Sequence, residues 1–173
     1  MKGQAIILGL LMKKPLTGYE LRERIEEHLI HFYDGGYGMI YPTLKKLEAA
    51  GLVTKETVVQ SDKPNKNIFA ITPAGKAAFK EALEADLADD SFKSDYLLRL
   101  YFGEFLDKKE LIALTQEKIR HTQSHYDALK SKSTNWDKSA TPEQKFTYEF
   151  GLAQYENSLN LLRKELKLLE KYK

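Results

Sequence analysis

Three groups of polar and basic side chains in the first half of the sequence have the chemistry needed to bind a polyanion. Lysine and arginine neutralise phosphates, and tyrosine and threonine hydroxyls can form hydrogen bonds with base edges. Residues 1–80 contain 12 Lys and Arg against 8 Asp and Glu, a net charge of +4, whereas residues 81–173 contain 15 against 17, a net charge of −2. This asymmetry favours a polyanionic partner for the first half only. The candidate contact residues are Thr17, Gly18, Tyr19, Arg22, Tyr41, Thr43, Lys45, Lys46, Lys63, Asn65 and Lys66.

Other arrangements of reactive side chains lack the partners that their chemistry requires. His121 and His125 are spaced i, i+4, and His28 and His31 are also close in sequence, but no cysteine or HExxH-type glutamate accompanies either pair. The glycine-rich segment 34–38 lacks the Gly-Lys-Ser/Thr of a phosphate-binding loop, and no serine lies in a nucleophile elbow. We therefore predict no enzymatic activity, no metal site and no cofactor.

Local signals predict helices over residues 3–13 and 17–31. Thr17 and Glu20 have the spacing of a capping box, in which each side chain accepts a hydrogen bond from the other residue's backbone amide. The apolar start of the chain has no small-residue cleavage site, so we expect a helix there and no signal peptide. The absence of cysteine and of a long apolar run fits a cytoplasmic protein without a membrane span.

A third helix is predicted from residues 38–39 to Gly51. Pro42 is tolerated only in a first turn, where its missing N–H would have no partner, so it fixes the start of the helix. Gly51 is suited to a left-handed end. One face carries the apolar side chains that hold the helix to its domain, namely Ile40, Leu44 and Leu47.

After the third helix the apolar pattern changes from the helical period to the alternation typical of strands. Segments 52–60 and 67–72 are rich in β-branched residues and predict a hairpin, after which Thr72 and Pro73 start a fourth helix. Three helices, a two-stranded hairpin and a fourth helix form a winged helix-turn-helix. That fold inserts its third helix into the major groove of DNA, and its second helix crosses the backbone.

The winged-helix order gives each candidate contact an expected role. Tyr41 and Thr43 lie near the start of the third helix, where side chains meet base edges, although the Tyr41 ring could equally pack in the core. The phosphate contacts are expected from the third helix, from the start of the second helix and from the wing. These residues are Lys45, Lys46, Thr17, Gly18, Tyr19, Arg22, Lys63, Asn65 and Lys66.

The second half predicts three further helices over 91–105, 107–132 and 141–173. The last carries apolar side chains at alternating spacings of 3 and 4, which suits packing against another long helix within the chain or in a second copy. This heptad seam, the predicted dimerisation surface, is Leu152, Tyr155, Leu159, Leu162, Leu166 and Leu169. We predict a mainly α protein with a winged-helix domain at 1–85 and an α-helical dimerisation and possible effector domain at 86–173.

The first half resembles the PadR family of bacterial transcriptional regulators. The resemblance rests on "LGLL…PLTGYEL", "YPTLKKLEAAGLV" and "FAITPAGKAAF", and the last helix is similar to that of a family branch with a helical dimerisation domain. The family wing often contains Gly-Arg-Pro-Arg-Lys-Tyr-Tyr, whereas residues 63–69 are "KPNKNIF", which implies lower DNA affinity or another flank preference.

The resemblance implies a homodimer that binds a pseudo-palindromic operator in double-stranded DNA and represses transcription until a small molecule relieves it. An aromatic effector, unidentified, could lie among the aromatic side chains of the second half. Two alternatives remain at this stage: a small-molecule sensor with weak DNA affinity, and a winged-helix module for protein–protein contact. The aromatic candidates are Tyr96, Tyr101, Phe102, Tyr126, Trp136, Phe146 and Tyr148.

Overall fold

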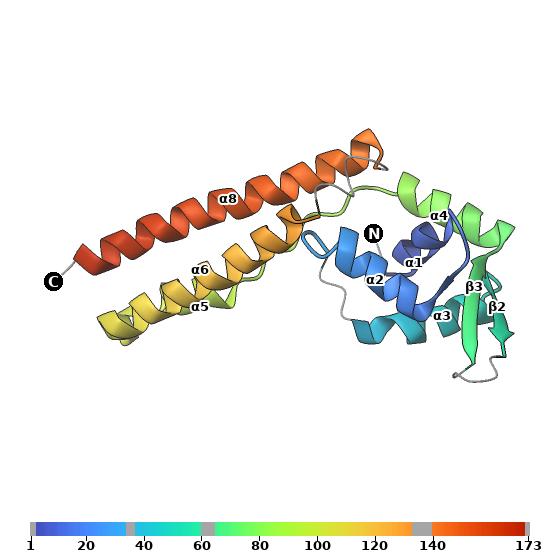
Figure 1. Cartoon of the computed structure of the whole chain (residues 1–173), viewed down its shortest axis with the longest axis horizontal. Helices are drawn as coiled ribbons and strands as arrows, with labels where there is room; N and C mark the ends of the chain where they lie inside the picture. Colours follow the sequence, from blue (N-terminus) through green and yellow to red (C-terminus); the bar gives the residue numbers. More distant parts are fainter. Residues whose placement is uncertain (1–2, 34–36, 60–64, 133–139, 172–173) are drawn as a thin grey trace. The chain divides into compact units, whose positions relative to one another are not determined.

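The structure, a computed structural model, describes residues 3–33, 37–59, 65–132 and 140–171 (Figure 1). The chain divides into two compact units, Met1–Asp89 and Asp90–Lys173. The first is a winged helix-turn-helix and the second is all-α, as the sequence predicts. Within the described residues, no helix combines the length and the apolar character that a membrane crossing requires.

Among its described residues the first unit contains four α-helices, and the second and fourth of them start at the predicted caps. Thr17 caps the second helix in a complete capping box with Glu20, and Thr72 caps the fourth with Pro73 in its first turn. Gly51 has a φ of 69°, which confirms the left-handed end of the third helix. The helices are α1 (Gly3–Leu11), α2 (Gly18–His28), α3 (Ile40–Ala49) and α4 (Pro73–Glu84), with a 3-10 turn, η1 (Tyr37–Met39), before α3. Thus α1 and α2 end two to three residues earlier than predicted.

A three-stranded antiparallel sheet joins the wing to the start of α2. Its strands are β1 (Leu16–Thr17), β2 (Val53–Val58) and β3 (Lys66–Ile71), in the order β1-β3-β2. Leu16 pairs with Phe69, and Val53 pairs with Ile71. β1 was not predicted, because its two residues are too few to display a strand pattern. Its pairing with β3 places the start of α2 beside the base of the wing.

The core of the first unit fastens α3 to the other elements. Ile40, Leu44 and Leu47 are almost completely buried, as their spacing predicts. Leu83 of α4, in contrast, is exposed. The buried cluster consists of Ile7, Leu8, Leu11, Leu16, Leu21, Ile25, Ile40, Leu44, Leu47, Val53 and Phe69. Burying side chains of this size contributes about 1.5–3 kcal/mol each, so the position of α3 is firmly set.

The second unit is built on two long antiparallel helices (Figure 1). Contacts pair opposite ends, since Lys108 Nζ donates to the Glu170 carbonyl oxygen at 3.2 Å and Arg163 donates to Gln123 Oε1 at 2.8 Å. A short helix and a 3-10 turn pack on the first long helix. The elements are α5 (Asp95–Tyr101), η2 (Gly103–Phe105), α6 (Lys108–Lys130) and α8 (Pro142–Lys171).

The heptad seam of α8 packs against α6 of the same chain. Leu159 is only 3% exposed and Leu162 is also buried, while Leu152 and Tyr155 pack around Leu129 of α6. Leu166 and Leu169 are half-buried. The expectation that this seam meets a second copy is therefore wrong for its buried part. The physical reason is that α6 carries a matching stripe and is held in place by the same chain, so pairing within the chain needs no second molecule.

Candidate nucleic-acid interface

The outward face of α3 presents a tyrosine and two lysines. Tyr41 is 64% exposed, so its ring is not a core side chain, and Lys45 and Lys46 are exposed one turn later. Thr43, in contrast, is only 8% exposed, and the expectation that it faces outward is wrong. It lies three residues after Ile40, on the same apolar stripe of the helix. That spacing was the signal that could have identified it as buried.

Gly18 makes room for the Tyr41 ring, and this contact joins the start of α2 to the start of α3. A Cβ atom at Gly18 would lie 2.7 Å from Tyr41 Cε1, 2.8 Å from Cζ and 3.0 Å from the hydroxyl oxygen. Real Cβ atoms essentially never approach another heavy atom to less than 3.0 Å. A side chain at position 18 would therefore displace the Tyr41 ring, which lies against the start of α2.

The capping box occupies much of the start of α2. The Thr17 amide donates to Glu20 Oε2 at 2.7 Å, the Thr17 hydroxyl donates to the same oxygen at 2.7 Å, and the Glu20 amide donates to Thr17 Oγ1 at 3.2 Å. The Thr17 hydrogen bonds, backbone first, hold the pKa of Glu20 below its ordinary value, with help from the charges of Lys66 and Lys14. Thr17 is buried, and its amide and hydroxyl both donate to Glu20, so neither is free to donate to a phosphate.

Side chains from three elements surround one hollow of about 440 Å³. The start of α2, the start of α3 and the beginning of β3 meet there, so the structure brings together residues that lie up to 50 positions apart. The lining residues are Thr17, Gly18, Tyr19, Glu20, Glu23, Tyr41, Asn65, Lys66 and Asn67. Several of the predicted contact residues thus share one concave surface, and Lys45 and Lys46 lie outside it on α3. Lys63 falls outside the described residues.

Two side chains near this hollow that could contact a ligand already form hydrogen bonds within the chain. Arg22 Nε donates to Glu26 Oε1 at 2.8 Å along α2, so its guanidinium already has a carboxylate partner. On the wing, Thr57 Oγ1 donates to Asn67 Oδ1 at 2.9 Å, which ties the two strands together. Asn65 and Lys66 are exposed.

One residue of this surface, Glu23, was not among the predicted contacts. Glu23 lines the hollow, and a hydrogen bond between the Tyr19 hydroxyl and Glu23 is the main cause that raises the pKa of Tyr19. The i, i+4 spacing of these residues on one helix face was the signal that could have found the pair.

The remaining candidate groups do not form a site within the described part of the chain. The described residues contain no cluster of three or more His, Asp or Glu side chains suited to a metal ion. The aromatic candidates are divided. Tyr96 and Tyr148 are buried, and the Tyr126 hydroxyl donates to Glu156 Oε1 at 2.6 Å. Tyr101, Phe102 and Phe146 are exposed on the surface, and Trp136 falls outside the described residues.

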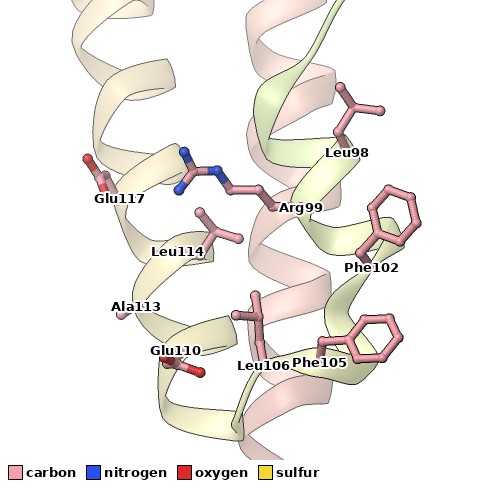
Figure 2. Close-up of a pocket in the computed structure, with 9 residues that line it drawn as sticks. All are labelled: Leu98, Arg99, Phe102, Phe105, Leu106, Glu110, Ala113, Leu114 and Glu117. Carbon is pink, nitrogen blue, oxygen red and sulfur yellow. The ribbon is translucent and has the colours of Figure 1, made fainter.

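A second hollow, of about 700 Å³, lies between α5, η2 and α6. Figure 2 shows the Arg99 side chain extending toward α6, while Phe102 and Phe105 point to the opposite side of η2 and α5. Phe105 is 78% exposed. We call this hollow the α5–α6 groove, and its lining is Leu98, Arg99, Phe102, Phe105, Leu106, Glu110, Ala113, Leu114 and Glu117.

Comparisons with known proteins agree with both units. Residues 7–81 match the Transcriptional regulator PadR-like family, and residues 92–170 match the family described as Virulence activator alpha C-term. The chain is 30% identical over 146 residues to the Negative transcriptional regulator PadR of Bacillus subtilis (strain 168), a match that covers 84% of this chain and 80% of that protein.

Two solved structures extend this likeness over almost the whole chain. The crystal structure of smu.1604c from Streptococcus mutans UA159 is 45% identical with a TM-score of 0.91, covering 96% of this chain and 99% of the other. The crystal structure of Bacillus subtilis PadR in complex with operator DNA is 25% identical with a TM-score of 0.81, covering 96% and 98%. This chain, a winged helix joined to a helical second unit, therefore belongs to the PadR-like family of transcriptional regulators.

Proposed function

We propose that this chain is a homodimeric, sequence-specific DNA-binding repressor. Residues 1–85 contact the DNA, and residues 86–173 pair with the second copy. The observation that carries the proposal is the joint exposure of Tyr41, Lys45 and Lys46 on α3 beside a hollow formed with α2 and the wing. A winged helix presents that surface to duplex DNA. A 25% identical relative with the same fold was crystallised with its operator DNA.

The geometry suits insertion of α3 into the major groove. The apolar stripe of α3 is buried, so only its opposite face is free for a ligand. Tyr41, at the start of the helix, is placed for a base edge, and Lys45 and Lys46 are placed for phosphates. Lys66 and Asn65 contact the backbone from the wing side of the hollow. Tyr19 and the amide groups of Gly18 and Tyr19, which the capping box does not engage, face the backbone on the other side.

Binding of the DNA upstream of the chain's own gene tests this proposal. We expect a gel shift that weakens steeply with salt, because about eight phosphate contacts in a dimer reduce affinity by roughly 10⁴-fold between 50 and 200 mM salt. Lys45→Ala with Lys46→Ala should reduce both the affinity and the salt slope. Absence of a shift, or a shift that salt does not change, would contradict a DNA-binding function.

Repression is proposed from the relative named as a negative transcriptional regulator. A dimer that occupies a pseudo-palindromic operator uses two copies of α3, with half-sites about 34 Å apart. Bound across a promoter, such a dimer excludes the polymerase. A reporter gene placed behind the upstream DNA should therefore be expressed more strongly when the chain is deleted, and lower expression on deletion would identify an activator.

The dimer surface is proposed on the outer side of the second unit, in place of the buried seam. Leu98, Tyr101, Phe102 and Phe105 are exposed on α5, η2 and the junction between them. Leu98, Phe102 and Phe105 also line the α5–α6 groove (Figure 2). The Tyr101 and Phe102 rings meet edge to face, with centroids 5.0 Å apart. Exposed apolar clusters of this kind mark protein–protein contact, because their burial removes unfavourable hydration.

Light scattering of the purified chain measures the dimer directly. Phe102→Glu with Phe105→Glu places two charges in the proposed contact and should convert a dimer of roughly 40 kDa, twice the 19.9 kDa of one chain, into a monomer. Leu83→Glu is the matched control, since it adds a charge at an exposed apolar position of the first unit. A dimer that survives the double substitution would place the interface elsewhere.

Relief of repression by a small aromatic molecule is the remaining part of the proposal. The α5–α6 groove combines apolar side chains with Arg99, whose guanidinium also bonds Asp95 at 2.8 Å, so its lining suits an apolar ring with a polar edge. An effector in this groove would compete with the second copy, and binding would then shift the equilibrium toward a form with weaker operator affinity. Titration of the operator complex with aromatic acids should release the DNA, and no release at any concentration would contradict an aromatic effector.

A further inference from the structure

The long helix α8 has an exposed apolar side opposite its buried seam. Leu161 is 60% exposed and Leu168 is 40% exposed. Each follows a buried or half-buried leucine of the heptad seam by two positions, and two positions on an α-helix lie about 200° apart. Because the seam packs against α6 of the same chain, this side of α8 points away from α6. We call it the outer stripe, and its members are Phe146, Phe150, Leu161, Lys164, Leu168 and Lys171.

The outer stripe combines apolar side chains with two cations. Lys164 and Lys171 are exposed and lie seven positions apart, which is about 10.5 Å along a helix. Leu168 lies between them. A contact between two such stripes would bring cations against cations, and this repulsion disfavours the pairing of one stripe with another. The outer stripe therefore suits an apolar partner surface that carries acidic side chains.

The α5–α6 groove has this composition and the same spacing. Glu110 and Glu117 lie on α6 in its lining, seven positions apart, with apolar side chains between them (Figure 2). The guanidinium of Arg99, which also lines the groove, is paired with Asp95 at 2.8 Å. The groove thus presents two carboxylates at the same interval along a helix at which the outer stripe presents two ammonium groups.

We propose that the outer stripe of one copy lies in the α5–α6 groove of a second copy, and that the reciprocal contact forms at the same time. This pairing rests on the dimer proposed above and deepens it, since it names the two surfaces that meet. Two identical contacts related by a twofold axis close the dimer. An antiparallel alignment places Lys164 against Glu117 and Lys171 against Glu110, and it also brings opposite ends of the two helix dipoles together. Leu168 then lies over the apolar floor of the groove.

Chemical cross-linking tests which surfaces meet, because the chain has no cysteine of its own. Lys164→Cys and Glu117→Cys are made in separate full-length chains, which are mixed, allowed to exchange subunits and treated with a short bismaleimide. The mixture should give a covalent dimer of about 40 kDa, twice the 19.9 kDa of one chain, and either chain alone should give none. Glu81→Cys, at an exposed position of α4 in the first unit, replaces Glu117→Cys in the control mixture and should give no covalent dimer.

Charge reversal measures the same contact in solution. Lys164→Glu and Glu117→Lys should each weaken the dimer by roughly tenfold or more in sedimentation equilibrium, because each substitution occurs twice in the dimer and brings like charges together. Combined in one chain, the two substitutions exchange the charges and should restore the dissociation constant to within about threefold of wild type. Lys76→Glu, at an exposed position of α4, is the matched control and should leave the dissociation constant unchanged.

The outcomes separate this pairing from the dimer on which it rests. A covalent dimer from Lys164→Cys alone would show that two stripes meet, and one from Glu117→Cys alone would show that two grooves meet; either result overturns the proposal. No cross-link in the mixture, or charge reversals that do not rescue each other, would overturn it equally. A monomeric wild-type chain would instead refute the dimer itself. Circular dichroism of each variant should match wild type, because both positions are exposed.

Discussion

Substitution of Gly18 by alanine should uncouple sequence discrimination from stability. The new Cβ would lie 2.7 Å from Tyr41 Cε1 and 3.0 Å from the Tyr41 hydroxyl oxygen, so the ring must move. It can move, because Tyr41 is 64% exposed and belongs to the surface. The tyrosine would leave the position from which we propose that it contacts a base, while the core beneath α3 stays intact.

The expected effect on stability is small because two terms oppose each other. Alanine is about 0.8–1 kcal/mol better than glycine inside a helix, and less at a first turn. Displacement of the Tyr41 side chain from its rotamer costs about 0.5–1.5 kcal/mol. The free energy of unfolding should therefore change by no more than about 1 kcal/mol in either direction. Discrimination should fall more, by roughly tenfold, if Tyr41 supplies one base contact in each half-site.

Two other glycines provide matched controls for this substitution. A methyl group added at Gly38 would have no atom within 4 Å, so Gly38→Ala should change neither stability nor DNA selection. A Cβ at Gly75 would meet the backbone carbonyl of Leu52, which cannot rotate away, so Gly75→Ala should destabilise the first unit by several times more than Gly18→Ala. Urea unfolding gives the stabilities, and competition between operator and random DNA gives the discrimination.

The proposed role for the present position of the Tyr41 ring is refuted if Gly18→Ala retains full sequence discrimination while Tyr41→Ala loses it. In that case the ring would contact DNA from another position. It is also refuted if Gly18→Ala unfolds the chain as Gly75→Ala does, because the ring would then be part of the core. Equal losses of operator and random-DNA binding in Tyr41→Ala would make Tyr41 a structural residue.

Three further substitutions test the assignment of individual side chains. Thr43→Val should keep operator discrimination within about twofold, because the side chain is only 8% exposed and faces the core; a strong loss in competition assays would show that the hydroxyl reaches the DNA. Leu159→Ala should lower the free energy of unfolding of the second unit, measured in urea, by about 2–4 kcal/mol, while light scattering should still give the mass of a dimer. A monomer would show that the heptad seam of α8 is part of the dimer interface. Hydrogen bonds from Thr17 lower the pKa of Glu20, so ionised Glu20 stabilises the fold above its ordinary pKa of 4.5 and this contribution disappears as the pH falls through the lower folded value. The stability of Glu20→Gln should accordingly depend less on pH in acid urea titrations, and an unchanged dependence would assign the acid transition to other carboxyls.

The sequence by itself determined the ends of helices and the order of elements. The capping boxes of Thr17 with Glu20 and of Asp107 with Glu110 are both present, and Pro42 lies in the first turn of α3 as predicted. These features are local, because a cap connects residues three positions apart and a proline acts on its own turn. Such signals do not depend on the rest of the fold.

Only the tertiary structure decided which side of each helix or strand is buried within the chain and which side is exposed. Thr43 is buried although it is polar, and Tyr41 is exposed although it is aromatic. The apolar seam of α8 meets α6 of the same chain, and the two-residue strand β1 exists only because β3 lies beside it. The hollow that gathers Tyr19, Glu23 and Tyr41 likewise depends on residues distant in sequence. Helical periodicity shows which face of a helix is apolar, but it does not show which other element packs against that face. The packing partner depends on contacts between residues distant in sequence, and these contribute free energy only once the chain between them has folded into a closed loop.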